Sequence, residues 1–366
     1  MQSQESVYTR LARKPEIIPQ YIQIKKDKNP IFIWGCGDLA IQVYNYCQNY
    51  EIPVEGFFVN LPEEKTSLEG LPVYKIEQVI ERYPKFSTII GYADYAYGSA
   101  WLQKVENNEN TYSITSCVYG IWHILSEHFF AENEDTLNAF YNELPDELSR
   151  QCFCSYFESR MNDDSSYIFP YYKKGISYYK NDVFSLGQGE TLLDVGAYIG
   201  ESVWSFVDAV NGTYRSIIAL EPDENNCRIL RKGIKDRAIQ DVIVRQVCAY
   251  DKEGFVKFSG DQQEGGIQEN AEQYRLYQAV TLDSLCQELN ASASLLKINF
   301  PFAVSQILNG AKHLLQEKKP KVVIRAGFDE VVLIETYKTL KRLNPNYLLY
   351  LRYTVGIPQG LTIFAV

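Results

Sequence analysis

Apolar and polar residues along the first half of the chain follow a pattern that is typical of strands followed by helices. Residues 31–34 (IFIW) form a short apolar run, GCGDLA follows as a tight turn, and IQVYNYC carries apolar residues at helical spacing. Further apolar runs at 54–60 and 87–92 enclose a turn and an amphipathic stretch at 68–83. This alternation predicts a parallel sheet with helices on both faces.

The pattern then changes to helices without strands, from about residue 122 to residue 162. Pro145 and Asp146 divide this stretch, and Asp146 is expected to cap the second helix. A new series of strands and helices begins at Glu190. We therefore expect an arm at 1–28, a Rossmann-like nucleotide-binding-type domain at 29–120, a helical connector at 121–174 and a second α/β domain at 175–366.

The second series of elements gives the clearest pattern. Residues 190–210 (ETLLDVGAYIGESVWSFVDAV) read as a buried strand, a glycine turn and a helix, and residues 214–234 repeat the order of strand, acidic end and helix. Apolar strands follow in LLKINF and PKVVIRAGF, and the chain closes with NYLLYLRY and LTIFAV. The last two segments are expected to form an antiparallel edge on a doubly wound sheet.

An acidic residue and two glycines mark the turn after the first strand of this series. Asp194, Gly196 and Gly200 place a close-approach turn before a helix N-terminus, which suits the carboxylate-bearing methionine part of S-adenosylmethionine (SAM). Asp194 can orient the turn or accept from the ligand's ammonium. Glu221, at the end of the next strand, can accept from both ribose hydroxyls. The alternatives are a simple tight turn with a surface carboxylate, and an NAD site, which more typically has two glycines separated by one residue.

Residues 175–366 resemble the FkbM family of methyltransferases in YYKNDVFSLGQGETLLDVGAYIGES, ALEPDENNCRIL, VCAYDKEG, VTLDSL, LLKINF and LNPNYLLYLRY. The resemblance implies a class I methyltransferase fold, SAM as methyl donor and O-methylation of a sugar or another small hydroxylated metabolite. It also assigns a set of residues to cofactor binding: Asp194, Gly196, Ala197, Tyr198, Gly200 and Glu221, with Cys248 and Ala249 near the adenine.

The chain departs from this family at the end of the LLKINF strand. The family commonly has Lys-Ile-Asp-Val-Glu-Gly-Ala-Glu where this chain has KINFPFAV. Lys297 is kept, but Asn299, Pro301, Phe302 and Val304 replace the Asp, the first Glu, the Gly and the second Glu. Methyl transfer to a hydroxyl needs an oriented acceptor and a proton acceptor. Lys297 and Asn299 are the catalytic candidates at this strand, although the amide of Asn299 can orient but not usefully accept a proton.

Four other polar residues could supply the missing base: Asp283, His313, Arg325 and Asp329. Each also has an ordinary structural explanation, as a turn acid, a helix-surface residue or a solvated charge. The sequence therefore leaves two outcomes open. Either the base has moved, or the activity has been lost.

The first glycine turn follows a strand, and its residues Gly35, Gly37 and Ala40 approximate the small-residue spacing of a dinucleotide-binding turn. The acidic residue expected at the end of the next strand is Asn60, which weakens the case for NAD. Gly35, Gly37 and Asn60 are therefore candidates for a second nucleotide or nucleotide-sugar site, and the alternative is a domain that only packs against its neighbour. His123 and His128 are expected to be structural, without a metal site.

Composition narrows the remaining choices. The net charge of −10, without an extended basic patch, argues against nucleic acid as a partner. No apolar run approaches the roughly 20 residues of a membrane span, and no secretory signal precedes the first domain, so we expect a cytoplasmic protein. The 28 tyrosines and 18 phenylalanines suit carbohydrate or flat-ring ligands but also fit a compositional bias.

Three hypotheses follow. The first is a SAM-dependent O-methyltransferase that acts on a sugar or nucleotide-linked sugar in glycan or polysaccharide biosynthesis, with a small-molecule or glycan acceptor. The second is a catalytically inactive scaffold or regulatory partner with a methyltransferase fold. The third is an NAD-dependent enzyme that works through the first glycine turn. A homo-oligomer is compatible with all three.

Overall fold

The structure is a computed structural model, and it describes residues 6–16, 18–60, 65–114, 124–259, 266–267 and 274–366. The chain forms two compact units. The N-terminal unit comprises Met1–Tyr141, Arg150–Lys173 and Val355–Leu361, and the C-terminal unit comprises Asn142–Ser149, Lys174–Thr354 and Thr362–Val366. Both units therefore take residues from the helical stretch at 121–174, and the domain boundaries expected from the sequence stay a prediction.

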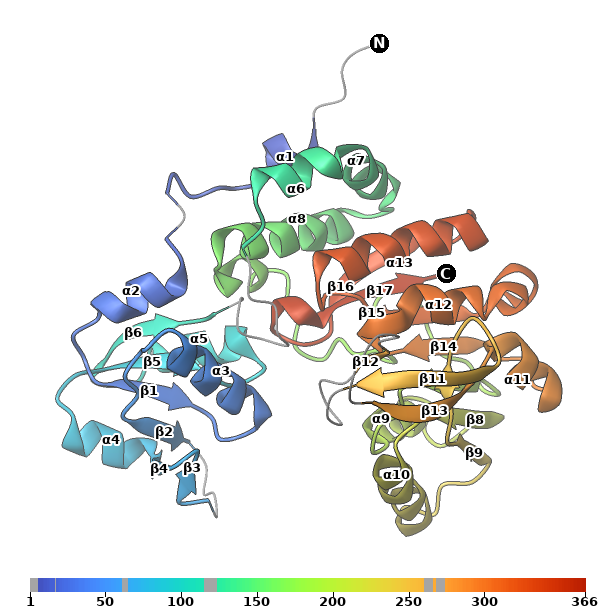
Figure 1. Cartoon of the computed structure of the whole chain (residues 1–366), viewed down its shortest axis with the longest axis horizontal. Helices are drawn as coiled ribbons and strands as arrows, with labels where there is room; N and C mark the ends of the chain where they lie inside the picture. Colours follow the sequence, from blue (N-terminus) through green and yellow to red (C-terminus); the bar gives the residue numbers. More distant parts are fainter. Residues whose placement is uncertain (1–5, 17, 61–64, 115–123, 260–265, 268–273) are drawn as a thin grey trace. The chain divides into compact units, whose positions relative to one another are not determined.

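The N-terminal unit is built on a six-stranded sheet with the order β3-β4-β2-β1-β5-β6 (Figure 1). The β1, β2, β4, β5 and β6 strands pair in parallel, and β3 pairs antiparallel to β4. The strands are β1 (Ile31–Trp34), β2 (Gly56–Val59), β3 (Ser67–Leu68), β4 (Leu71–Lys75), β5 (Phe86–Ile90) and β6 (Asn108–Tyr112). The β1 and β5 strands are buried along their whole length, as expected for a parallel sheet covered on both faces.

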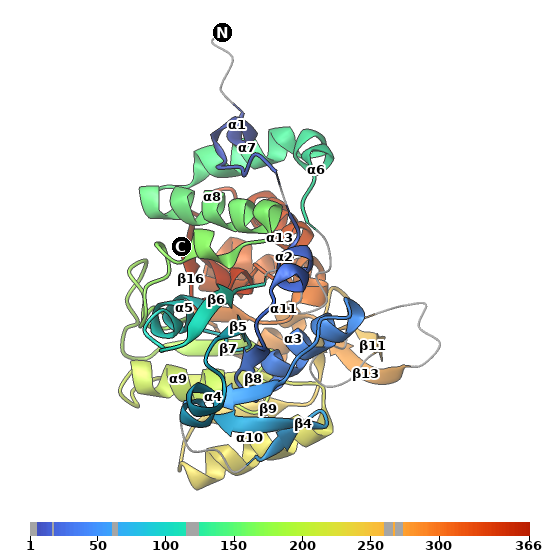
Figure 2. The same cartoon turned by 90° about the vertical axis from the view of Figure 1, so that its left-hand side faces the viewer.

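Helices follow these strands in the order that the apolar pattern predicts. The helices α3 (Asp38–Asn49), α4 (Ile76–Arg82) and α5 (Tyr95–Leu102) belong to the Rossmann-like fold, and α5 packs on β5 and β6 (Figure 2). Among the described residues, the other helical segments in the first half of the chain are α1 (Val7–Arg10), α2 (Gln20–Lys26), α6 (Glu127–Glu132), α7 (Glu134–Glu143), α8 (Glu147–Asn162) and the 3-10 turn Ser165–Ile168.

The C-terminal unit is built on a seven-stranded sheet with the order β16-β17-β15-β14-β7-β8-β9. Its strands are β7 (Thr191–Val195), β8 (Ser216–Leu220), β9 (Val242–Arg245), β14 (Leu295–Ile298), β15 (Lys321–Arg325), β16 (Leu349–Tyr353) and β17 (Leu361–Ala365). Its helical segments are α9 (Glu201–Ala209), α10 (Glu224–Asp236), α11 (Leu282–Glu288), α12 (Val304–Asn309), α13 (Glu330–Leu343) and the π-helical turn Leu314–Lys318. The β17 strand runs antiparallel to β15, which confirms the expected antiparallel edge.

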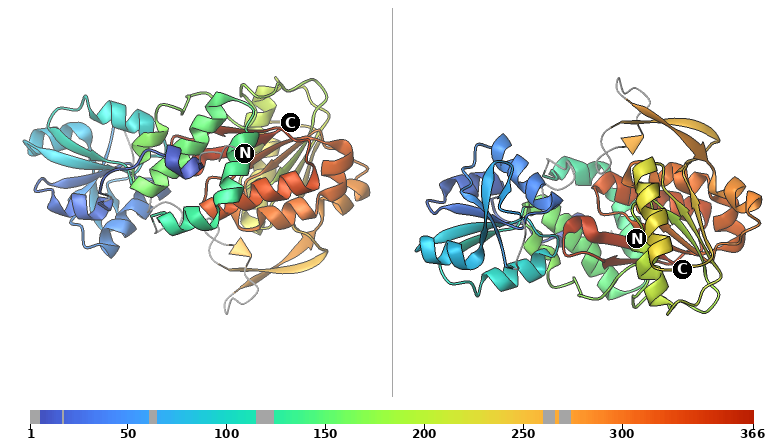
Figure 3. Two further views of the ribbon diagram at one scale, coloured as in Figure 1. Left: turned by 90° about the horizontal axis from the view of Figure 1, so that it is seen from above. Right: turned by 90° about the horizontal axis from the view of Figure 1, so that it is seen from below.

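A separate four-stranded sheet with the order β10-β13-β11-β12 stands beside this sheet. It consists of β10 (Cys248–Ala249), β11 (Gly254–Ser259), β12 (Gly266–Ile267) and β13 (Arg275–Val280). The long strands β11 and β13 project from the C-terminal unit as a ribbon in the views from the side and from below (Figures 2 and 3). The apolar pattern of the sequence does not indicate that these strands form a sheet of their own.

A buried arginine connects the start of α8 to β16 within the C-terminal unit. Arg352, 3% exposed, lies 2.7 Å from Asp146 and 2.8 Å from Asp182, and it donates to Ser149 Oγ over 3.0 Å. Burial opposes ionisation of Asp146, but hydrogen bonds from Arg352 and Ser149 lower the pKa of its carboxyl to about 2. Asp146 also accepts from Ser149 N over 2.7 Å, which confirms the predicted helix cap.

Candidate functional site

The glycine turn after β7 has the backbone conformation that its sequence predicts. Gly196 and Gly200 have φ angles of +73° and +108°, in the region that favours glycine, and Gly200 directly precedes α9. A Cβ atom on Gly196 would lie 2.7 Å from the backbone oxygen of Asn299. The turn therefore lies close against the end of β14, where a side chain at position 196 would be excluded.

The side chain of Asp194 is fully buried beneath this turn and is engaged by other side chains. Its carboxylate lies 2.8 Å from Lys297 Nζ and accepts a hydrogen bond from Ser202 Oγ over 2.5 Å. Lys297, which is 2% exposed, also donates to the carbonyl of Gly196 over 2.9 Å. Of the two roles expected for Asp194, this geometry supports orientation of the turn.

Glu221 lies directly after β8 and contacts the same turn from the other side. One carboxylate oxygen accepts from Tyr198 N over 2.9 Å, and the other accepts from Asp223 N over 3.1 Å and from Asn226 Nδ2 over 3.2 Å. Burial, with a smaller contribution from the charge of Asp223, raises the pKa of the Glu221 carboxyl above its ordinary value. The carboxylate is thus fixed next to the backbone of Tyr198, beside the close-approach turn.

Cys248 and Ala249 are buried in β10. Burial, and then the nearby charge of Glu221, raise the pKa of the Cys248 thiol to about 12, so this thiol is protonated at neutral pH. The thiol of Cys227 donates to the backbone oxygen of Glu221 over 3.0 Å. Cys227 and Cys248 thus place two uncharged thiols near Glu221, which suit an apolar ring better than a charged ligand.

Asn299 follows β14, and its backbone N donates to the carbonyl of Val195 over 3.1 Å. Its side-chain Oδ1 is buried without a hydrogen-bond partner among the described residues. A buried acceptor without a partner is costly, and a donor on a bound ligand would satisfy it. The next residues form a 3-10 turn, Pro301–Ala303, before α12, and Val304 at the start of that helix is buried.

The four other polar candidates lie in different surroundings. Asp283 accepts from two backbone N–H groups, those of His313 and the residue after it, over 2.8 and 2.9 Å. Asp329 caps α13 through a bond of 2.6 Å from a backbone N–H, and the side chain of His313 is 74% exposed. Arg325 ends β15, with its guanidinium carbon 4.9 Å from the ring centre of Phe328. The contacts of Asp283 and Asp329 are those of structural carboxylates.

Residues beyond the predicted set contribute to the site. Ser202 and Asn226 were not singled out from the sequence, although each lies in the first turns of the helix after a predicted strand. Tyr179 is buried, with a hydroxyl that has no hydrogen-bond partner among the described atoms. Burial, and then the charge of Asp194, hold the pKa of this hydroxyl well above its usual range. The sequence feature that could have indicated Tyr179 is the pair Tyr178–Tyr179, which precedes β7.

The first glycine turn has a similar geometry in the N-terminal unit. Gly35 has a φ of +123°, and a Cβ there would lie 2.6 Å from the carbonyl oxygen of Gly91. Gly37 directly precedes α3, and Asn60 follows β2. Lys65 Nζ donates to the backbone oxygen of Cys36 over 3.2 Å. The assignment of Gly35, Gly37 and Asn60 to a nucleotide site stays a prediction.

Of the two histidines that the sequence predicts to be structural, the structure describes only His128. His123 lies outside the described residues, and His128 is exposed, with Nε2 3.1 Å from Glu132. Within the described part of the chain, no group of three or more His, Cys, Asp or Glu side chains could hold a metal ion. No helix in the same part is long and apolar enough to cross a membrane.

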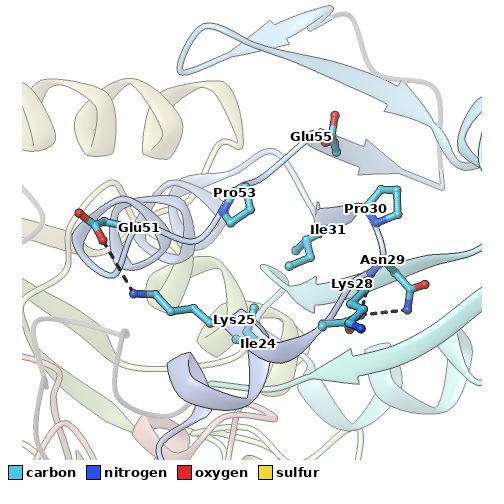
Figure 4. A pocket seen from close by; sticks show the side chains of 10 residues that line it. Ile24, Lys25, Lys28, Asn29, Pro30, Ile31, Glu51, Pro53 and Glu55 are labelled. Atoms are coloured by element: carbon cyan, nitrogen blue, oxygen red, sulfur yellow. Dashed lines mark hydrogen bonds and ion pairs between the residues drawn. The ribbon is translucent and has the colours of Figure 1, made fainter.

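Figure 4 shows a pocket at the amino-terminal ends of β1 and β2, lined by residues such as Lys25, Asn29, Glu51 and Glu55. Lys25 and Glu51 form an ion pair of 4.0 Å across it. Ligands of open parallel sheets bind at the carboxyl ends of the strands, which is the opposite edge of this sheet. The pocket therefore lies at the opposite end of these strands from the glycine turn of the N-terminal unit.

The order of the C-terminal sheet, its antiparallel edge and the turn between β7 and α9 define the class I methyltransferase fold. Residues 194–351 of the C-terminal unit match the model of the methyltransferase FkbM domain, and the N-terminal unit has a Rossmann-like fold.

One solved structure agrees with this fold along most of both chains, and two others match with low TM-scores. A methyltransferase FkbM from Methylobacillus flagellatus KT has a TM-score of 0.66 at 15% identity, over 96% of this chain and 94% of that chain. A precorrin-6y C5,15-methyltransferase from Geobacter metallireducens GS-15 has a TM-score of 0.34 at 15% identity, over 50% and 81%. Fibrillarin from Aeropyrum pernix, solved with natively bound SAM, has a TM-score of 0.34 at 14% identity, over 50% and 70%. No curated protein matches the sequence at a significant level.

Proposed function

We propose that the chain is a SAM-dependent O-methyltransferase that acts on a sugar or nucleotide-linked sugar in glycan or polysaccharide biosynthesis in the cytoplasm. The observation that carries the proposal is the placement of the Glu221 carboxylate against the Gly196–Gly200 turn. The match of residues 194–351 to the methyltransferase FkbM domain supports methyl transfer as the reaction class.

The residues at this edge of the sheet fit SAM. Glu221 would accept from the ribose hydroxyls, and the glycine turn with the start of α9 would receive the methionine part. Cys248 and Ala249 offer an uncharged surface for the adenine. Asn299 Oδ1 is a hydrogen-bond acceptor that has no partner within the described residues. SAM, when bound, supplies an electrophilic methyl group.

Lys297 has a positioning role in this proposal. Its ammonium joins the Asp194 carboxylate to the carbonyl of Gly196, and it is too deeply buried to meet an acceptor from solvent. The ion pair holds the turn against the ends of β7 and β14, where Lys297 and Asp194 lie directly opposite each other in the strand register. This fixes the backbone groups that bind the cofactor before it arrives.

Asn299 is proposed to orient the acceptor. Its amide can donate to and accept from a hydroxyl, but it cannot take up a proton at neutral pH. Among residues 299–304 it has the only hydrogen-bonding side chain. Proton removal would therefore fall to water or to a group from another element, and the rate depends on how easily the acceptor hydroxyl ionises.

The absence of a proton-accepting side chain at residues 299–304 favours a second candidate, a scaffold with a methyltransferase fold but no catalysis. Transfer of labelled methyl from SAM to a panel of nucleotide-linked sugars separates the two. The proposal expects at least one methylated sugar, and loss of transfer in Glu221→Ala. Binding of SAM without transfer to any sugar in the panel supports the scaffold and overturns the proposed reaction.

Affinity for SAM is expected to depend on pH through Glu221. The charged carboxylate is the better acceptor for ribose hydroxyls, and burial raises its pKa above the ordinary 4.5. The affinity should therefore fall as the pH decreases towards this raised pKa, beginning above pH 4.5. Calorimetric titrations across this range measure the effect, and a Glu221→Gln variant should show a flatter profile. An equal slope in both proteins would remove Glu221 from the site.

A further inference from the structure

The N-terminal unit has a second site of convergent loops, at the carboxyl ends of β1 and β5. These strands are neighbours in the sheet, but the chain leads from β1 to β2 on one side and from β5 to β6 on the other. Such a reversal opens a crevice between the two following loops, where open α/β sheets bind ligands. The loops here are residues 35–37, which lead into α3, and residues 91–94, which lead into α5.

Four aromatic side chains from these elements form what we call the aromatic platform: Trp34, Tyr92, Tyr97 and Trp101. The Trp34 ring is 3% exposed and stacks on Trp101, with 4.9 Å between ring centres. Tyr92 and Tyr97 lie 5.3 and 6.4 Å from Trp34 and are 45% and 42% exposed. The buried ring of Trp34 and the partly buried ring of Trp101 thus support two tyrosine rings that face solvent.

The backbone of α5 is shaped to hold this arrangement. A Cβ on Gly98 would lie 2.6 Å from the Trp34 ring, so glycine is what lets the indole lie against the helix. Gly91 begins the loop that carries Tyr92. A Cβ atom on Gly91 would lie 2.9 Å from the Cα of Ala40, so a side chain at position 91 would clash with α3. The platform is therefore supported by close packing on both sides of β1 and β5.

The polar groups beside the platform are acidic. Asp94 accepts from Tyr97 N over 3.0 Å and from the hydroxyl of Tyr172 over 3.4 Å, and burial followed by the Asp94 charge raises the pKa of Tyr172 to about 12. Asp38 occupies the first turn of α3. Carboxylates at the start of both helices disfavour a phosphate there, because like charges repel, but they accept readily from hydroxyl groups.

We propose that the aromatic platform binds an uncharged sugar ring. The C–H face of the sugar lies on one of the two tyrosine rings, Tyr92 or Tyr97, which stand at 68° to each other, and its edge contacts the other. The sugar hydroxyls point towards the carboxylates. Exposed tyrosine rings provide an apolar face with a polar tip, the surface that a ring with one apolar face and several hydroxyls requires. This sugar can be free or carried on a nucleotide. The proposal stands independently of SAM binding in the C-terminal unit.

The test uses the full chain and six probes: glucose, galactose and N-acetylglucosamine, each free and as the UDP-linked sugar, with UDP alone as the reference. Quenching of tryptophan fluorescence reports on Trp34 and Trp101 together with the other two tryptophans of the chain, and calorimetry gives the dissociation constant. We expect saturable binding of at least one neutral sugar, and tighter binding of its UDP-linked form than of UDP alone, because the platform contacts the sugar ring.

Variants connect this binding to the platform. Tyr97→Ala and Tyr92→Ala should each weaken it by about tenfold, while Tyr97→Phe keeps the ring and most of the affinity. Tyr274→Ala, which removes a tyrosine of similar exposure from the C-terminal unit, should leave it unchanged. The proposal is overturned if no probe binds saturably, if UDP binds as tightly as its sugar conjugates, or if both alanine variants bind like the unmodified chain.

Discussion

Replacing Glu221 by Gln is expected to weaken SAM binding by roughly 30- to 150-fold, the equivalent of about 2–3 kcal/mol for charge-assisted hydrogen bonds. The residue is 6% exposed, and its carboxylate accepts from the backbone N of Tyr198, so the fold holds this charge at the turn. Calorimetric titration of the variant with SAM measures the loss.

The matched control for this prediction is Glu224→Gln. Glu224 is exposed in the first turn of α10, three residues after Glu221, so the substitution removes the same charge close to the site without touching the turn. Its affinity for SAM should stay within about twofold of the unmodified chain, because exposed charges at this distance are screened. Equal losses in both variants would show that general charge, not the Glu221 carboxylate, governs binding.

Replacing Lys297 by Met is expected to lower the free energy of unfolding by about 3–5 kcal/mol, because it leaves a buried carboxylate without its counter-charge. Lys297 and Asp194 are 2% and 0% exposed, and the ion pair joins β7, β14 and the glycine turn. The double variant, Lys297→Met with Asp194→Asn, removes both charges and should recover much of the loss. Denaturant unfolding of the three proteins measures both effects.

Lys338→Met provides the comparison for this experiment. Lys338 pairs with Glu335 over 2.9 Å on the surface of α13, where both side chains are 47% exposed. A surface pair of this kind contributes about 0–1 kcal/mol. If Lys297→Met unfolds no more easily than Lys338→Met, or if the double variant is no more stable than the single one, the ion pair does not brace the turn.

The sequence predicted the two Rossmann-like folds because their information is local. Apolar runs of strand length, each followed by a glycine turn and helical spacing, identify β1 with α3 and β7 with α9 independently of the rest of the chain. The antiparallel edge could be expected because two strands at the end of the chain, β16 and β17, have only a short connection between them. Glu221 could be predicted from its place at a strand end.

The ion pair of Asp194 with Lys297 could not be predicted, because it depends on which strands are neighbours in the sheet. Lys297 is distant in sequence and meets Asp194 only because β14 pairs with β7 in a particular register. A signal was nevertheless present, since a lysine inside the apolar run LLKI needs a buried counter-charge. The separate β10-β13-β11-β12 sheet also depends on long-range pairing.

The aromatic platform was likewise hidden in the sequence. One strand, one loop and one helix supply the platform residues Trp34, Tyr92, Tyr97 and Trp101. The high tyrosine content of the sequence fits ring-shaped ligands but equally fits a compositional bias. Only the adjacency of β1 and β5 brings these rings together. Composition could indicate that ring ligands were chemically plausible, but it could not show where the rings gather.

The most direct test of the account is calorimetric titration of the full chain with SAM, its demethylated product S-adenosylhomocysteine, and NAD in parallel. The account predicts micromolar binding of the first two and no binding of NAD. Both SAM and S-adenosylhomocysteine carry the ribose and the amino-acid carboxylate and ammonium groups that Glu221 and the glycine turn recognise. Failure of SAM and its product to bind, or binding of NAD instead, would contradict it.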